Sequence, residues 1–178
     1  MKKNVVTLLG LLLPLITCAA DLPVVKEVDV QKYAGRWYEV VRLPNRFQEV
    51  CEGEVNATYT LRSDGRIDVL NACRKQDGSS TSALGLARLA EGPAQPAKLE
   101  VRFAPAWLGF LPFVWGDYWI IDLAEDYSTS LVGTPDRKYL WLLSRTQTIS
   151  DARKKLLIDK ARNLGFATEQ LIQTRQQP

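Results

Sequence analysis

Alternation of apolar and polar residues is the main pattern in this chain from about residue 37 to residue 145. In residues 54–62, Val55, Ala57 and Tyr59 occupy one set of alternate positions, and Asn56 and Thr58 occupy the other. Successive side chains of a β-strand point to opposite faces, so this stretch predicts a strand with one buried face. The sequence at 63–66 contains Asp-Gly, which favours a tight hairpin into the next strand.

The same pattern predicts eight strands, at residues 37–43, 54–62, 66–73, 81–89, 99–103, 117–123, 128–133 and 139–145. Short connections between them favour an antiparallel, up-and-down order. Closing such a sheet into a barrel removes the exposed edges that promote aggregation. We therefore predict an all-β fold, an eight-stranded antiparallel up-and-down barrel whose interior holds either packed side chains or one small ligand.

The periodicity changes after the eighth strand. Ser150 is a suitable helix N-cap and Gly165 a suitable stop. The apolar residues recurring between them near helical spacing are Ala152, Leu156, Ala161 and Leu164. This pattern predicts one C-terminal α-helix packed on the outside of the barrel, followed by a short edge strand within residues 170–174.

The N-terminus has the features of an export signal. Lys2 and Lys3 precede an apolar stretch at 5–16, which is shorter than the roughly 20 residues of a membrane span. Leu-Ile-Thr-Cys at 15–18 resembles a bacterial lipobox with Cys18 as the lipidated residue, although Thr17 is unusual there. Cleavage after Ala20, releasing a soluble periplasmic protein, is the alternative. We divide the chain into a signal region at 1–18, a tether at 19–30 and one domain at 31–175.

Two further cysteines, Cys51 and Cys73, flank the predicted hairpin. In an oxidising compartment such a pair is expected to form a disulfide. The alternative is two separate buried thiols.

Charge and residue types exclude several functions. The chain has 23 basic and 20 acidic residues with no basic stripe, so nucleic-acid binding is not expected. It has no histidine, which excludes Ser-His-Asp and Cys-His nucleophile systems and histidine-based metal sites. No Gly-rich phosphate loop follows a strand. We predict a protein that is not an enzyme and needs no metal or cofactor.

Three motifs in order resemble those of the lipocalin family. Gly35-Arg36-Trp37-Tyr38 is similar to its G-x-W-Y motif, Glu125-Asp126-Tyr127 to its T-D-Y motif, and Arg145 to its third motif. Glu125 departs from the usual threonine. The resemblance runs from about residue 30 to 174 and extends to bacterial outer-membrane lipoproteins and apolipoprotein D. It implies a structural role for Gly35, Trp37 and Arg145, with Trp37 closing one barrel end and Arg145 lying across its indole.

The family register places a mostly apolar set of side chains inside the barrel. If Trp37 points inward, alternation predicts that Glu39 and Val41 do so too. The expected ligand-binding residues are Glu39, Tyr59, Val69, Asn71, Phe103, Tyr118, Tyr139 and Trp141. A carboxylate inside a barrel is costly unless it is paired or protonated, so we expect hydrogen-bond donors or water around Glu39.

Residues 104–116 carry no charge and contain Trp107, Phe110, Phe113 and Trp115. The resemblance places this segment in a loop at the open end of the barrel. Three roles are open: an apolar lid over the mouth, a contact with a membrane surface, or a contact in a homodimer.

The resemblance implies non-enzymatic binding, storage or transport of a fatty acid, lysophospholipid or related lipid. With a lipidated Cys18, the protein would be anchored in the outer membrane and face the periplasm. The rival hypotheses are a carrier of a pigment, haem or signalling molecule, an envelope interaction protein with a filled barrel, and an enzyme using Cys or Tyr on the same scaffold.

Overall fold

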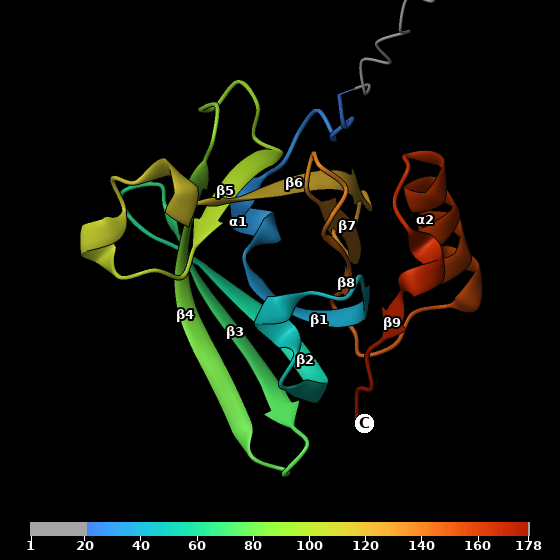
Figure 1. Ribbon diagram of the computed structural model, residues 1–178. Coiled ribbons are helices and arrows are strands. Elements are labelled where there is room, and N and C mark those ends of the chain that lie inside the picture. The colour runs from blue at the N-terminus through green and yellow to red at the C-terminus, as the bar shows by residue number, and fades with distance from the viewer. Residues whose placement is uncertain (1–20, 178) are drawn as a thin grey trace, which may run out of the picture.

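A closed antiparallel sheet forms the body of the protein in the computed structural model, which describes residues 21–177 (Figure 1). Its strands are β1 Gly35–Arg42, β2 Cys51–Leu61, β3 Ile67–Lys75, β4 Ser80–Leu89, β5 Lys98–Arg102, β6 Gly116–Leu123, β7 Thr129–Gly133 and β8 Leu140–Ser144. Each strand pairs antiparallel with the next, and β1 pairs with both β2 and β8, which closes the barrel. The predicted up-and-down barrel is confirmed.

Short helices precede the first strand and occupy several of the later connections. They are α1 Val30–Tyr33 and the 3-10 helices η1 Arg46–Gln48, η2 Ala106–Leu108, η3 Pro112–Val114 and η4 Thr168–Gln170. The long helix is α2 Asp151–Asn163, and the predicted last strand is present as β9 Ile172–Gln173, which pairs with β1. Among residues 21–177, no helix combines the length and apolar character needed to cross a bilayer.

Helix α2 packs against the outside of the sheet, as predicted (Figure 1). Ser150 caps it, its Oγ accepting from the backbone N of Arg153 at 3.3 Å. The packed residues are Leu157 and Ala161. Ala152 and Leu156, which the sequence pattern assigned to this face, are exposed, Leu156 by 54%. Leu157, Ala161 and Leu164 follow the i, i+4, i+7 spacing of one helical face, and Leu156 lies off it.

A β-bulge in β1 changes which of its side chains face the interior. The pairing between β1 and β8 shifts between Glu39 and Val41, so one extra residue is inserted there. Val41 consequently packs with Val40, and with Leu157 and Ala161 of α2, in a hydrophobic cluster on the outside of the barrel. We call this cluster the outer core cluster. The prediction that Val41 points into the barrel is therefore wrong. Simple alternation cannot anticipate a bulge, because it assumes one residue per position along both strands.

The segment before α1 packs on the barrel instead of forming a tether. Leu22 is only 1% exposed, inside the outer core cluster. The backbone N of Val25 donates to the carbonyl of Ile120 on β6 at 3.0 Å. The tether predicted at 19–30 is therefore wrong for residues 22–28, which are part of the folded body. The predicted signal region at 1–18, with Cys18, lies outside the described residues.

Candidate functional site

A cavity of about 720 Å³ occupies the inside of the barrel. The structure brings the whole sequence-predicted binding set to its wall: Glu39, Tyr59, Val69, Asn71, Phe103, Tyr118, Tyr139 and Trp141. These side chains come from β1, β2, β3, β6 and β8 and from the connections that follow β5 and precede β8. We call this cavity the chamber, and its open end the mouth, which lies among the connecting segments at residues 45–51, 103–117 and 134–139. That these residues hold a ligand stays a prediction.

The closed end of the chamber is built around Trp37, which is fully buried. Its indole Nε1 donates to the carbonyl of Tyr33 at 2.9 Å, and the Arg145 guanidinium lies 3.9 Å from its ring centroid. Arg145 also donates to a set of backbone carbonyls, those of Lys32, Tyr33, Ala34, Arg36 and Tyr127. One guanidinium thus joins α1, the start of β1 and the connection between β6 and β7.

Gly35 allows this close approach. Its φ is +94°, and a Cβ added there would lie 3.3 Å from Arg145 Nη1. A larger residue would be strained by the backbone and crowded by the guanidinium.

Tyrosines from separate elements form the chamber floor above Trp37. The Tyr33 ring lies 4.9 Å from the Trp37 ring and 5.7 Å from that of Tyr59. The hydroxyl of Tyr118 is 2.8 Å from that of Tyr33 and 2.9 Å from that of Tyr59. Burial raises the pKa of each phenol, that of Tyr33 to about 12. All of them therefore stay neutral at ordinary pH.

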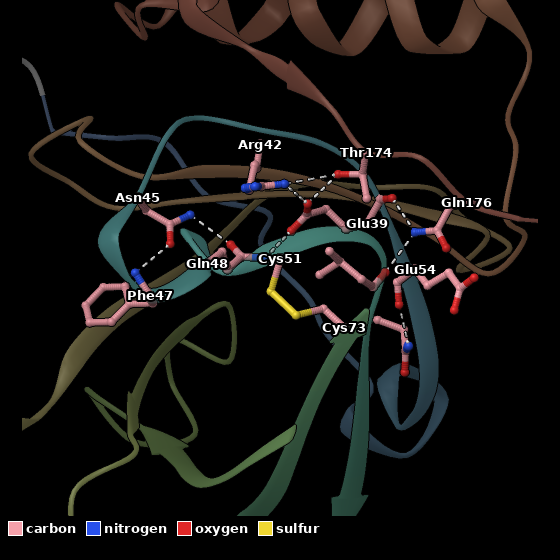
Figure 2. Close-up of a disulfide and its surroundings, with 12 residues drawn as sticks. Glu39, Arg42, Asn45, Phe47, Gln48, Cys51, Glu54, Cys73, Thr174 and Gln176 are labelled. Carbon is pink, nitrogen blue, oxygen red and sulfur yellow. Dashed lines mark hydrogen bonds and ion pairs between the residues drawn. A yellow bond between two sulfur atoms is a disulfide. The ribbon is translucent and has the colours of Figure 1, made fainter. Parts of the chain in front are cut away.

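Glu39 lies higher on the wall and is only 2% exposed. Its Oε1 accepts from Arg42 Nη1 at 2.9 Å and from the Thr174 hydroxyl, and its Oε2 accepts from Gln48 Nε2 at 2.6 Å (Figure 2). The buried carboxylate is thus paired with a cation and surrounded by donors. This is the environment that the sequence led us to expect for Glu39.

Gln48 on η1 connects this cluster to the mouth. Its side-chain oxygen accepts from Asn45 Nδ2 at 2.8 Å and from the indole Nε1 of Trp141 at 2.9 Å. The Trp141 ring stacks 5.9 Å from that of Tyr139, which lies 5.8 Å from Phe47. Gln48 therefore fixes the orientation of an aromatic face at the mouth.

The C-terminal segment closes a gap between β1 and β2. These two strands pair only from Gly35–Tyr38 to Asn56–Tyr59, and beyond that β9 pairs with Val41 and Arg42. Gln176 Nε2 bridges the two walls, donating to the carbonyls of Glu39 at 2.9 Å and Val55 at 2.8 Å (Figure 2). Gln176 thus joins the chamber-lining residues Glu39 and Val55, each more than 120 positions away from it in the sequence.

The disulfide between Cys51 and Cys73 lies on the same side of the mouth (Figure 2). It joins the start of β2 to the end of β3, with Cα atoms 5.6 Å apart. The expected disulfide is confirmed, and both cysteines line the chamber.

The apolar loop at 104–116 projects from the mouth. Trp107, Phe110 and Phe113 are 73%, 78% and 79% exposed. Trp115 is held instead: its Nε1 donates to the carbonyl of Gly109 at 2.8 Å, and the Arg88 guanidinium lies 3.9 Å from its ring. Phe113 and Trp115 reach the chamber wall, whereas Trp107 and Phe110 do not line it.

The sequence did not point to several residues of the site: Tyr33, Arg42, Gln48, Thr174 and Gln176. Tyr33 carried a usable signal, because it is an aromatic residue four positions before Trp37. The others are polar residues outside any motif. Only the fold places Gln48 in the chamber wall and brings Arg42, Thr174 and Gln176 into contact with Glu39. Within residues 21–177, no group of three or more His, Cys, Asp or Glu side chains is arranged to hold a metal ion.

A family model described as a lipocalin-like domain matches residues 28–176. The chain belongs to the lipocalin family. Temperature-induced lipocalin-1 of Arabidopsis thaliana is 40% identical over 157 residues, covering 88% of this chain and 83% of that protein. Outer membrane lipoprotein Blc of Escherichia coli K12 is 38% identical over 167 residues, covering 90% and 89%. Mouse apolipoprotein D also matches.

Among solved structures, insecticyanin of the tobacco hornworm Manduca sexta is similar with a TM-score of 0.69. The match covers 89% of this chain and 86% of that chain at 17% identity, which shows the fold alone. Membership in the lipocalin family makes this protein a non-enzymatic binder of a hydrophobic ligand, as the sequence resemblance implied.

The second lipocalin motif also supports the closed end. Tyr127 has a φ of +59°, and its hydroxyl accepts from the backbone N of Asp29 at 2.9 Å. The Asp126 carboxylate accepts from the backbone N of Ser128 at 2.9 Å. The motif thus orders a turn and attaches the N-terminal segment to it. Glu125, the departure from the usual threonine, precedes these contacts and is absent from them.

Proposed function

We propose that this lipocalin binds and carries a membrane-derived lipid with one long acyl chain, a fatty acid or a lysophospholipid, in the bacterial cell envelope. The observation that carries the proposal is the chamber, about 720 Å³ in volume and lined largely by apolar and aromatic side chains. Small-molecule pockets typically measure about 300–1,000 Å³. Each methylene moved from water into such a chamber contributes about 0.8 kcal/mol, so a long chain needs few specific contacts.

The envelope location rests on the N-terminus and on the relatives. The lipobox-like sequence ends at Cys18, and several similar proteins are named outer membrane lipoproteins. We propose that an acylated Cys18 anchors the protein in the outer membrane, facing the periplasm. Cleavage after Ala20, leaving a soluble periplasmic protein, is the alternative.

The arrangement of the loop at 104–116 favours the membrane contact over the lid, and the homodimer contact is the alternative that the experiment below separates. Trp107 and Phe110 are exposed and lie away from the chamber wall, so they cover nothing in it. Tryptophan suits the interface between lipid and water. The loop would therefore hold the mouth against a bilayer while a lipid enters or leaves.

Native mass spectrometry of the protein purified from its own envelope tests both ligand and anchor. We expect one bound fatty acid or lysolipid, recovered by organic extraction, and a mass that includes acyl chains at the N-terminus. An empty protein that takes up no added lipid would overturn the lipid-carrier proposal. A mature chain beginning at residue 21 would overturn the anchor and leave the carrier proposal standing.

A variant that fills the chamber tests its role in binding. Asn71 lines the chamber and is paired with Ala57 on β2 and Ala83 on β4, so a tryptophan at this position would project into the cavity between two small side chains. Asn71→Trp is expected to abolish fatty-acid binding and to leave the fold intact. Leu70→Trp is the matched control, because Leu70 is the adjacent residue of β3 and is 42% exposed on the outside. Unchanged affinity in Asn71→Trp would show that the chamber is not the site.

The loop is tested with a double substitution. Trp107→Ser with Phe110→Ser is expected to reduce co-sedimentation with phosphatidylethanolamine–phosphatidylglycerol vesicles while leaving the affinity for free fatty acid unchanged. A change in oligomeric size with unchanged vesicle binding would support the homodimer contact instead. Loss of fatty-acid affinity alone would support the lid.

A further inference from the structure

The hydroxyl groups at the chamber floor form one continuous chain. It runs from Tyr59 on β2 to Tyr118 on β6, then to Tyr33 on α1 and to Ser130 on β7, with oxygen–oxygen distances of 2.9, 2.8 and 3.2 Å. Ser130 Oγ also lies 3.3 Å from the carbonyl oxygen of Asp122. Each phenol lines the chamber, so a ligand that reaches the floor meets this chain.

The carbonyl at one end gives the chain a direction. A carbonyl oxygen only accepts, so Ser130 must donate to Asp122. Ser130 then has no second proton and accepts from Tyr33. Tyr33 in turn accepts from Tyr118, and Tyr118 accepts from Tyr59. In this direction every hydroxyl proton has a partner.

The opposite direction loses a hydrogen bond. If Tyr118 donates to Tyr59, the proton of Tyr59 has no acceptor among the described residues. Tyr33 then has one proton for two contacts, so either its contact with Tyr118 or its contact with Ser130 is left without a proton as well. An unmade hydrogen bond in a buried place is unfavourable, so the empty chamber keeps the direction that ends at Asp122.

The protonation of the floor supports this assignment. Burial raises the pKa of Tyr33, Tyr59 and Tyr118, so every phenol keeps its proton at neutral pH. The floor then offers lone pairs, above all on Tyr59 Oη, but no free N–H or O–H.

We propose that the chamber floor is a subsite for a neutral hydrogen-bond donor, such as a ligand hydroxyl, and that it rejects ligand groups that can only accept. This proposal rests on the proposed function and adds to it a preferred orientation of the bound lipid. A carboxylate or phosphate would find no donor at the floor, so charged lipids enter tail first with the head group at the mouth. Among lipids of equal length, one with a hydroxyl near the tail end binds more tightly than one with a ketone.

Matched fatty acids test the proposal, since an ω−1 hydroxyl and an ω−1 ketone differ in donor capacity with little change in size. The chain length is first set by the saturated acid that binds most tightly. Wild-type protein is expected to favour the hydroxy acid by about five-fold, the factor that one ordinary hydrogen bond supplies. Equal affinity, or a preference for the ketone, would overturn the proposal.

Tyr118→Phe is expected to remove the preference. Without the Tyr118 hydroxyl, Tyr33 still donates to Ser130, but Tyr59 is left with an unpaired proton that faces the chamber. The floor then offers a donor as well, which the oxygen of either ligand can use, so the ketone and the alcohol are expected to bind about equally. Tyr38→Phe is the control, because alternation places Tyr38 on the outer face of β1, and it should keep the wild-type preference. A Tyr118→Phe protein with that preference unchanged would also contradict the assignment.

If no fatty acid binds at all, the proposed lipid function fails and the floor is still testable. Cyclohexanol and cyclohexanone are then compared by the chemical shifts of the floor tyrosines. The expected result is a saturable shift with cyclohexanol at lower concentration than with cyclohexanone. The same response to both would reject the donor subsite independently of the lipid.

Discussion

The two ends of the barrel each contain a tryptophan covered by an arginine at the same distance, yet they differ in what surrounds the pair. Arg145 lies 3.9 Å from the Trp37 ring at the closed end, and Arg88 lies 3.9 Å from the Trp115 ring at the mouth. Trp37 is fully buried, and Arg145 also holds the backbone of α1. Arg88 is exposed and pairs with the Glu100 carboxylate at 2.9 Å. The geometry of one contact therefore does not set its contribution to stability, since burial and the other hydrogen bonds decide it.

The largest expected difference is between the tryptophans. Trp37→Ala removes a fully buried ring and leaves a cavity, so we expect a loss of about 3–5 kcal/mol in the free energy of unfolding. Trp115→Ala is expected to cost about 1 kcal/mol, because solvent already reaches that site. Urea unfolding of both variants measures this. Similar losses in the two would show that Trp115 at the mouth contributes as much to stability as Trp37 at the closed end.

A buried charge pair on the mouth side tests whether burial alone explains why a contact at the closed end contributes more to stability than one at the mouth. Arg42 and Glu39 are 2.9 Å apart and both are buried. Glu39→Leu is expected to destabilise the protein by about 3 kcal/mol, because it leaves Arg42 unpaired. Glu39→Leu with Arg42→Met should recover most of the loss. A double variant as unstable as the single one would indicate that Thr174 and Gln48, and not the ion pair, determine the cost.

The closed end should also be the region that responds to alkali. Burial holds the pKa of Tyr33 at about 12, whereas an unfolded tyrosine titrates near 10. The folded value is the higher one, so the stabilisation is complete below pH 10 and is lost as the pH rises through 12, about 2–3 kcal/mol for this residue. Urea midpoints and tyrosinate absorbance across this range measure it. Tyr118→Phe, which removes one titrating floor group, should show a shallower decline; a flat profile in the wild type would contradict the buried floor.

The smallest expected effects separate the two arginines. Arg145→Lys keeps the charge but loses the planar fork that reaches several carbonyls, and we expect a cost of about 2 kcal/mol. Arg88→Lys is expected to cost under about 0.5 kcal/mol, because its ion pair is exposed. Thermal or urea unfolding of the pair gives the comparison, and equal values would mean that the carbonyl contacts of Arg145 contribute little.

The sequence predicted the parts of this protein that depend on local pattern. Alternation located the strands to within a few residues, and the Asp-Gly turn marked the β2–β3 hairpin. The chamber residues from Glu39 to Trp141 followed from that alternation together with the family register. Two failures were places where one residue of offset matters, Val41 beyond the bulge and Leu156 beside the true helix face. The third was the segment at 22–28, which resembled a tether because it lacks periodicity but packs on the barrel.

What the sequence determined by itself is the barrel, its motifs and the apolar character of the inside, because these follow from side-chain period and turn chemistry. The tertiary structure alone decided which distant polar groups meet. Tyr33, Tyr59, Tyr118 and Ser130 form one hydroxyl chain. Thr174 and Gln176 bond to Glu39 on β1, and Gln176 also bonds to Val55 on β2. Hydrogen bonds are short and directional, so they depend on positions that only the closed barrel fixes.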